Sequence, residues 1–221
     1  MLFPSPNSYI NIHSHRKPAL PNEFVIRNAY LSNSISRIVQ LPYAISVGLH
    51  PWHIKQQTPK ELSELLLEYA TLRNVLAIGE IGIDKAIETP VALQLKLFEV
   101  QYQVARALQK PVLLHTVKAY NEMIPFLKKT KVQFIFHGFS GNVQQAKELI
   151  KHGAILSFGK NLWSDKSKEV LLILPKHSFF LETDNAAINI DKIYAQAASI
   201  LQVETDEIKS DLFNTFAQLF K

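Results

Sequence analysis

The sequence predicts a (β/α)8 TIM barrel, an α/β fold in which eight parallel strands alternate with helices. Three features of the 221-residue chain support this prediction. Short apolar runs recur along the chain, amphipathic stretches separate most of them, and histidines or carboxylates repeatedly stand where an apolar run ends. Strands that alternate with helices build a parallel sheet, and eight such units close it into a barrel.

The apolar runs have the length and composition of buried strands in a parallel sheet. Strands are expected at 8–13, 23–29, 44–49, 75–81, 111–115, 133–137, 154–158 and 179–183.

The segments between most of these runs carry apolar residues at spacings of three and four, as helices that cover a sheet do. Helices are expected over 59–73, 90–109, 117–129, 142–153, 164–174, 191–203 and 205–220. The last of these opens with a sequence similar to a capping box, which begins at Thr205. The segment 31–42 has poor helical periodicity, and we expect a short or irregular connection there.

Length and composition limit the possible functions. A chain of this length can bury one substantial core, so residues 1–221 are expected to form one domain. The chain has no cysteine, which excludes disulfides and thiolate metal ligands. The formal net charge of +5 is a mild bias toward anionic substrates.

The beginning of the chain, MLFPSPNSY, has neither a basic segment nor a long apolar one, and no apolar run is long enough to cross a membrane. We therefore expect a cytoplasmic protein without membrane contact, and we predict no obligate protein partner.

Six residues of metal-binding type stand at the ends of expected strands. His13 and His15 are two positions apart, so a strand turns both imidazoles toward the same side. Buried histidines and carboxylates are costly unless they are paired or bound to metal. Their repeated position at strand carboxyl ends, where barrel enzymes have their active sites, therefore favours a metal site. The candidate ligands are His13, His15, Glu80, His115, His137 and Asp184.

Several longer motifs carry a family resemblance. They are NIHSH, SVGLHPWH, AIGEIGID, the Gln94/Phe98/Gln101 spacing before KPVLLH, FHGFSGNVQQAKELIKHGAILSFG, FLETD and the final FNTFAQLF. Together, and in this order from Asn11 to the C-terminus, they resemble the TatD family of metal-dependent hydrolases. GEIGID and HGFSG are the most specific of them. The resemblance implies a TIM barrel, two divalent metal ions (Mg, Mn or Zn) and hydrolysis of phosphodiester bonds in DNA.

The resemblance also implies individual roles. His13 and His15 would hold one metal, His115 and His137 the other, and the two oxygens of Glu80 would bridge them. Asp184 would ligate the first metal and accept the proton of the attacking water, since a carboxylate beside a cation stays ionised. In such a two-metal mechanism a metal-bound hydroxide is the nucleophile.

Residues beside these ligands are expected to bind the substrate or to orient the ligands. His50, at the end of an expected strand, would contact the substrate phosphate, or else cap the strand as a loop histidine. Asp84 would orient Glu80 or a ligand histidine. Trp52 would stack a base or simply plug the barrel mouth.

Departures from the family pattern put substrate recognition in question. Asn11 stands where the family usually has aspartate. Val117 stands where many members carry arginine. Lys118 follows it, but on a strand its side chain is expected to point away from the direction of residue 117. The segment between His15 and His50 is shorter than usual, and the loop after FLETD is reduced to NAAINI. Both shortened segments fall on the face of the barrel where substrate would bind.

Three functions remain possible from the sequence. The first is a deoxyribonuclease, or an enzyme for another phosphodiester substrate. The second is a hydrolase of small esters, amides or lactones, because one fold hosts many chemistries. The third is a binding module without turnover. The retention of all six candidate ligands, which are costly to bury, argues against it.

Overall fold

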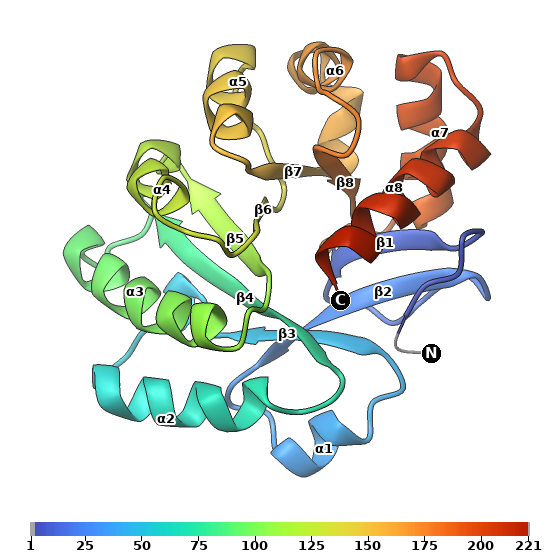
Figure 1. Cartoon of the computed structure of the whole chain (residues 1–221). Coiled ribbons are helices and arrows are strands. Elements are labelled where there is room, and N and C mark those ends of the chain that lie inside the picture. The colour runs from blue at the N-terminus through green and yellow to red at the C-terminus, as the bar shows by residue number, and fades with distance from the viewer. Residues whose placement is uncertain (1–2, 221) are drawn as a thin grey trace.

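Eight parallel strands form one sheet, ordered β1 to β8, in the computed structural model of the chain, which describes residues 3–220 (Figure 1). Residues 1–2 and 221 of the predicted domain lie outside this range. The strands are β1 (Tyr9–Ser14), β2 (Glu23–Tyr30), β3 (Ala44–Gly48), β4 (Val75–Asp84), β5 (Val112–Val117), β6 (Phe134–Phe136), β7 (Ile155–Phe158) and β8 (Phe179–Leu181). The predicted barrel class is confirmed.

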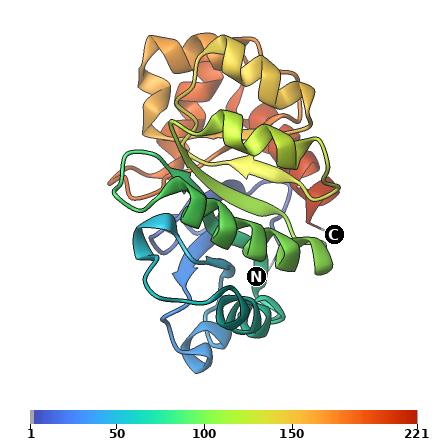
Figure 2. The same cartoon turned by 90° about the vertical axis from the view of Figure 1, so that its left-hand side faces the viewer.

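Helices follow the strands and cover the outside of the sheet (Figures 1 and 2). They are α1 (Ile35–Val39), α2 (Pro59–Ala70), α3 (Val91–Ala107), α4 (Tyr120–Leu127), α5 (Val143–Lys151), α6 (Asp165–Leu172), α7 (Ile190–Leu201) and α8 (Thr205–Leu219), with the short 3-10 helices η1 (Pro51–His53) and η2 (Lys160–Trp163). None of the helices within residues 3–220 combines the length and the hydropathy needed to span a membrane.

The two ends of the sheet meet between β1 and the residues that follow β8. A single parallel bridge joins Ser14 to Asp184, supported by backbone hydrogen bonds from His15 to Asp184 and from Asp184 to His13. Nearer the start of β1, a side chain supplies hydrogen bonds where, in the described part of the chain, no backbone pairing joins β1 to β8. The Tyr194 hydroxyl donates to the Ile10 carbonyl at 3.0 Å and accepts from the Ile10 amide at 2.9 Å.

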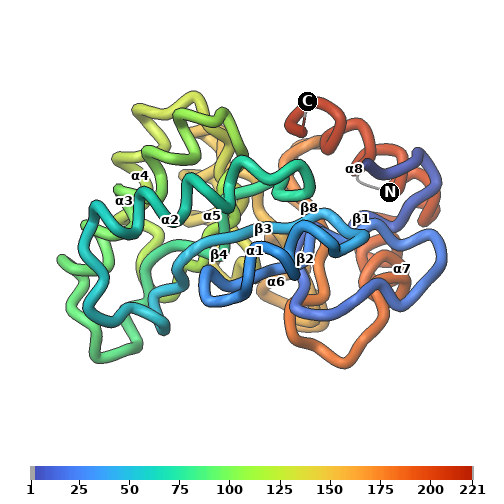
Figure 3. Tube along the Cα trace, turned by 90° about the horizontal axis from the view of Figure 1, so that it is seen from below, coloured from blue at the N-terminus to red at the C-terminus, as the bar shows by residue number. Residues whose placement is uncertain are grey.

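Both ends of the described chain lie beside this seam. Figure 3 shows α7 and α8 next to β1, and both helices contact that strand. The Phe3 ring meets Phe216 of α8 edge to face, with centroids 5.3 Å apart. The final helices therefore hold the first strand in place, which keeps the first candidate ligands at the barrel mouth.

Some predicted boundaries differ from the structure. β4 continues to Asp84 because its pairing with β5 shifts register between Ile78 and Ile81, which lets the strand pass through the glycines of GEIGID. β8 ends at Leu181, and beyond it Asp184 forms a single isolated bridge with Ser14. The connection over 31–42 is short as predicted, with a five-residue helix. The capping box predicted at Thr205 is wrong, because Glu204 is the N-cap and makes no side-chain cap.

Candidate metal centre

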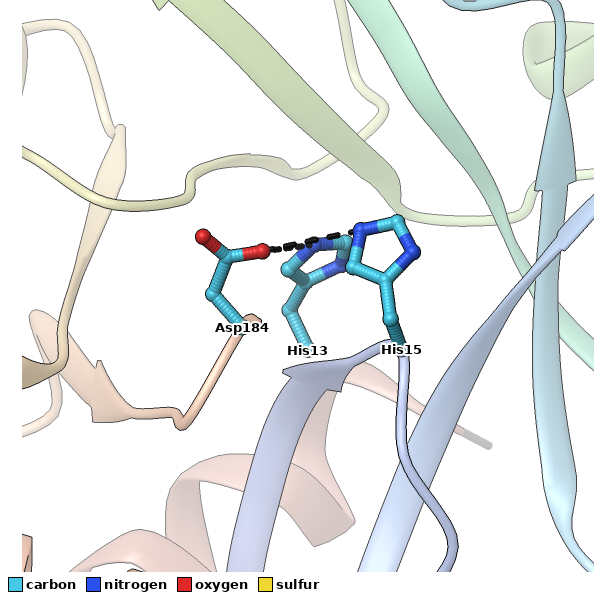
Figure 4. A group of neighbouring side chains, drawn as sticks. All are labelled: His13, His15 and Asp184. Atoms are coloured by element: carbon cyan, nitrogen blue, oxygen red, sulfur yellow. Dashed lines mark ion pairs between the residues drawn. The ribbon is translucent and has the colours of Figure 1, made fainter. Parts of the chain in front are cut away.

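Two histidines from the first strand face a carboxylate that follows the last. His13 lies in β1 and His15 directly after it, and their Nε2 atoms are 3.6 and 3.5 Å from Oδ1 of Asp184 (Figure 4). The backbone bonds of the β1–β8 seam fix this arrangement. Residues from opposite ends of the sequence thus form one group.

Glu80 occupies the middle of the site, and each of its carboxylate oxygens faces a different set of histidines. Oε2 is 3.5 Å from Nε2 of both His13 and His15. Oε1 is 2.7 Å from Nε2 of His137 and 2.9 Å from Nδ1 of His115. The structure therefore brings all six predicted ligands together, with Glu80 shared between two groups.

His50, predicted as a substrate contact, lies on the Oε1 side of Glu80. Its Nε2 is 3.2 Å from Oε1, and its Nδ1 accepts a hydrogen bond from the Trp52 backbone at 3.1 Å as the N-cap of η1. Burial lowers the pKa of His50, although Glu80 acts in the opposite direction. A neutral imidazole with one nitrogen directed at the site results. The capping contact that His50 makes is to η1, not to the end of the strand.

The charges around Glu80 and Glu182 favour a cation in the site. Burial of Glu80 opposes its ionisation, but the charge of His137 and hydrogen bonds from neighbouring histidines hold its pKa well below the usual range. Burial likewise opposes a charge on His137, yet Glu80 and Glu182 raise its pKa well above the usual value. The carboxylates therefore draw positive charge into this region, and a divalent ion supplies more of it than a proton.

The two ring nitrogens of His13 show whether the residues of the site fit a metal ion. The side chain is fully buried, and neither ring nitrogen has a hydrogen-bond partner among residues 3–220. Two ligands held at about 2.1 Å from one metal ion lie about 3.0–3.4 Å apart. The separations of 3.5 and 3.6 Å between His13 Nε2 and its carboxylate neighbours are close to this range. The nitrogen and oxygen donors suit Zn, Mn or Mg, so the residues present fit a divalent cation.

A further carboxylate orients one of the histidines. Asp84 Oδ2 is 3.2 Å from Nε2 of His115 and accepts from the Trp52 indole at 2.7 Å, a position from which Asp84 can orient this histidine. Trp52 is nevertheless 64% exposed, so its ring is an open aromatic surface beside the site rather than a buried plug.

Glu182 also contacts a candidate ligand, although no role was predicted for it. Its Oε1 is 3.3 Å from Nδ1 of His137 and accepts from the Gly138 amide at 2.9 Å, so it sets the orientation of the imidazole. The sequence contained a signal, because Glu182 is two positions before Asp184 and alternate residues of an extended segment share a face.

Two further residues without a predicted role come from β2. Asn28 accepts a hydrogen bond from the Glu80 amide at 3.0 Å, and the Tyr30 hydroxyl is 3.3 Å from Nδ1 of His15. Nothing in the sequence distinguishes these side chains from ordinary polar residues at strand ends.

A polar cleft of about 690 Å³ opens from the second histidine group. Lys85, Lys118 and Lys166 line it together with His115 and His137. The prediction that the Lys118 side chain points away from the site, as it would on a continuing strand, is wrong. β5 ends at Val117, and Lys118 has a φ of 53°, in the left-handed region. This turn places Lys118 at the cleft.

The closed barrel and the group of histidines and carboxylates at its carboxyl-terminal mouth define a protein of the metal-dependent hydrolase class. The family model described as TatD related DNase matches residues 27–221. The chain belongs to this TatD family, as the sequence motifs predicted.

Individual relatives agree with this assignment. An "Uncharacterized metal-dependent hydrolase" of Haemophilus influenzae is 31% identical over 152 residues, which cover 63% of this chain and 57% of that protein. A protein of Citrobacter rodentium named "3'-5' ssDNA/RNA exonuclease TatD" is 30% identical over 169 residues, 71% of this chain and 63% of that protein. The chain thus spans about three fifths of the length of these two relatives.

A third relative has a solved structure. The "Uncharacterized metal-dependent hydrolase YjjV" of Escherichia coli is 28% identical over 200 residues, 81% of this chain and 77% of its own length. The crystal structure of YjjV superposes with a TM-score of 0.82 at 24% identity, over 96% of this chain and 97% of that one. The two proteins therefore share the barrel fold.

Proposed function

We propose that this protein hydrolyses phosphodiester bonds in nucleic acid, at the ends of single-stranded DNA, with two divalent metal ions. The observation that carries the proposal is the position of Glu80, whose two oxygens face separate histidine groups. Such a bridging carboxylate suits a pair of metals that act on one phosphodiester.

The two ions, when bound, would supply Lewis-acid activation of water and charge neutralisation of the phosphodiester. His13, His15 and Asp184 would hold the first and His115 and His137 the second, with Glu80 shared. The His50 Nε2 atom, on the Oε1 side of Glu80, would contact a phosphate oxygen.

Asp184 is the group best placed to accept a proton. Its side chain is 40% exposed, so a water molecule can reach it. Burial acts to raise the pKa of Asp184, but the nearby imidazoles of His13 and His137 outweigh this effect and leave the pKa below the usual value. Asp184 is therefore ionised at neutral pH, as a general base must be.

The lysines of the cleft support an anionic substrate. Lys85 is paired with Glu122, and Lys166 donates to the Ser140 carbonyl at 2.6 Å. The ammonium of Lys118 has no acceptor among residues 3–220. An unpaired cation beside a metal centre suits a further phosphate of a polyanion.

The name of one relative points the same way. The Citrobacter rodentium protein is named as an exonuclease of single-stranded DNA and RNA. Exonuclease activity on single-stranded DNA is therefore the activity that we propose to test first.

The test uses the purified protein after dialysis against chelator, with Mg, Mn or Zn restored singly. We expect hydrolysis of single-stranded oligonucleotides to disappear with chelation and return with metal, and p-nitrophenyl esters and lactones to be cleaved more slowly. Full activity in excess chelator would remove the metal mechanism. Faster cleavage of esters than of any nucleic acid would remove the nuclease assignment.

Lys118→Ala tests the contribution of the cleft. Loss of one phosphate contact should lower the slope of log affinity against log salt for single-stranded DNA by about 0.7. Lys147→Ala is the matched control, since Lys147 is exposed on α5 and does not line the cleft. Equal salt slopes for both variants and the unmodified protein would exclude Lys118 from substrate binding.

A further inference from the structure

A second cavity lies on the other side of the metal centre. It has a volume of about 500 Å³ and lies between the ends of β2 and β3 and the beginning of α2. The lysine-lined cleft lies beside β5 and β6, and β4 with Glu80 runs between the two. The lining of the second cavity includes Tyr30, Leu31, Leu49, His53, Leu62 and Leu65.

The leucines make this cavity apolar at its base. Leu49 and Leu62 are buried and, with Leu97, form a small hydrophobic cluster separate from the main core. Leu31 packs against this cluster, and Leu65 of α2 remains 39% exposed at the wall. An apolar surface left open to solvent beside an active site is typical of a ligand-binding pocket.

Aromatic rings connect the cavity to the metal centre. The rings of Tyr30 and His53 meet edge to face with centroids 4.9 Å apart. The Tyr30 hydroxyl reaches His15, and the His53 ring lies 5.7 Å from that of His50. Tyr30 and His53 therefore line the cavity on the side that faces the candidate ligands.

Polar groups complete the lining. The side chains of Ser32 and Lys55 and the amide nitrogen of Gln57 offer hydrogen-bonding groups in the lining. The Gln57 Oε1 atom accepts from the Lys55 backbone at 2.7 Å, and Glu61 is engaged with Thr58 in the capping box of α2. A flat ring with apolar faces and a polar edge matches this combination, because its faces need apolar contact and its edge needs hydrogen bonds. An aliphatic chain would leave the polar groups unused.

We propose that this cavity binds the nucleobase of the nucleotide whose phosphodiester is cleaved. This inference rests on the proposed function and adds the part of the substrate that lies on the β2–β3 side of the metals. Tyr30, His53 and the leucines contact the base, while the neighbouring phosphates extend toward the lysine-lined cleft. The protein thus binds the two chemical parts of a nucleotide in two cavities of opposite character.

The test compares two phosphodiesters that differ in the base. Thymidine 5′-(p-nitrophenyl phosphate) carries one, and methyl p-nitrophenyl phosphate does not. We expect the unmodified protein to hydrolyse the thymidine compound with a kcat/KM at least about tenfold higher, within the range that contacts to one base contribute. Leu65→Gln should reduce this ratio about fivefold or more, because only the thymidine compound reaches the cavity.

Leu67→Gln is the matched control. Leu67 is 45% exposed on the same helix and does not line the cavity, so the ratio should stay at its original value. Ser32→Phe fills part of the cavity from the segment after β2 and should reduce the ratio without loss of melting temperature. Binding of thymidine alone, measured by calorimetry, should weaken in parallel in both cavity variants.

The outcomes separate the two proposals. Hydrolysis of neither phosphodiester would overturn the proposed function. Equal kcat/KM for both compounds, or a ratio unaffected by Leu65→Gln and Ser32→Phe, would overturn the nucleobase site alone. Loss of p-nitrophenyl octanoate cleavage in the cavity variants, with the thymidine ratio unchanged, would assign the cavity to an acyl group instead.

Discussion

Asn11 donates a hydrogen bond from Nδ2 to the Glu23 carboxylate at 2.8 Å. Its Nδ2 also donates to the Thr183 hydroxyl at 2.8 Å, and its Oδ1 accepts from the Thr183 amide at 3.0 Å. The Asn11 side chain thus forms hydrogen bonds with the Glu23 carboxylate and with Thr183, the residue before Asp184. An aspartate at this position would face Glu23 with a second negative charge.

We therefore expect Asn11→Asp to destabilise the protein by about 2–3 kcal/mol, because a buried carboxylate replaces a donor. Like charges raise carboxyl pKa values, so the loss should shrink as the pH falls and one carboxyl takes up a proton. Urea unfolding at pH 5 and pH 8 measures both effects. Adding Glu23→Gln to this variant should restore most of the stability, and a variant as stable as the original protein at pH 8 would contradict the expectation.

Glu80→Gln preserves the size of the side chain but removes the charge that serves both histidine groups. We expect the bound metal to fall from about two ions per chain to one or fewer, and the hydrolysis rate to fall with it. Metal content after gel filtration, determined by mass spectrometry, measures this. Glu148→Gln is the control, since Glu148 pairs with His152 at 3.1 Å, outside the site. Two ions in the Glu80→Gln protein would exclude Glu80 as the bridge.

Glu182→Gln should act through His137. The amide oxygen can still accept from Gly138, but the charge that supports the imidazole is lost. Removal of such an outer carboxylate typically weakens metal binding about 10–100-fold. Competition with a chromophoric chelator gives the affinity, and the melting temperature of the metal-free protein shows whether the fold is intact. An unchanged affinity would mean that Glu182 serves only the backbone of the loop.

Asp184→Asn tests the general base. Asp184 has a φ of 48°, and asparagine tolerates this left-handed region, so the backbone should be preserved. The amide can still ligate through oxygen but cannot accept the proton, and turnover should fall about 10²–10⁴-fold. Turnover, metal content and melting temperature are best measured on one preparation. Near-normal turnover in a less stable protein would show that Asp184 has only a structural role.

The sequence predicted the barrel and the grouping of the ligands because both depend on local patterns. An apolar run fixes where a strand ends, and the carboxyl ends of parallel strands meet at one mouth. That rule alone brings His13, Glu80 and His115 together, and the observed distances agree. The metal-binding roles of these residues stay predictions.

Other features depend on contacts that no local pattern reveals. The pairing of Asn11 with Glu23 requires the register of β1 against β2, and the turn at Lys118 depends on a single backbone angle after β5. Asn28 and Tyr30 reach the site because β2 lies between β1 and β3 in the sheet.

The sparse pairing between β1 and the end of β8 gives metal binding a mechanical consequence. Ser14 and Asp184 are 170 positions apart in the sequence, yet a cation held by His13, His15 and Asp184 would cross-link their segments. Opening of the barrel at this line would require loss of that ion, whereas Glu80 and His115 would stay on two strands that pair on both sides of the register shift. The metal would then contribute stability that rises with its saturation, about 2.7 kcal/mol at a concentration 100 times its dissociation constant. Removal of the first ion would thus loosen the junction between the two ends of the sheet before any other part of the barrel.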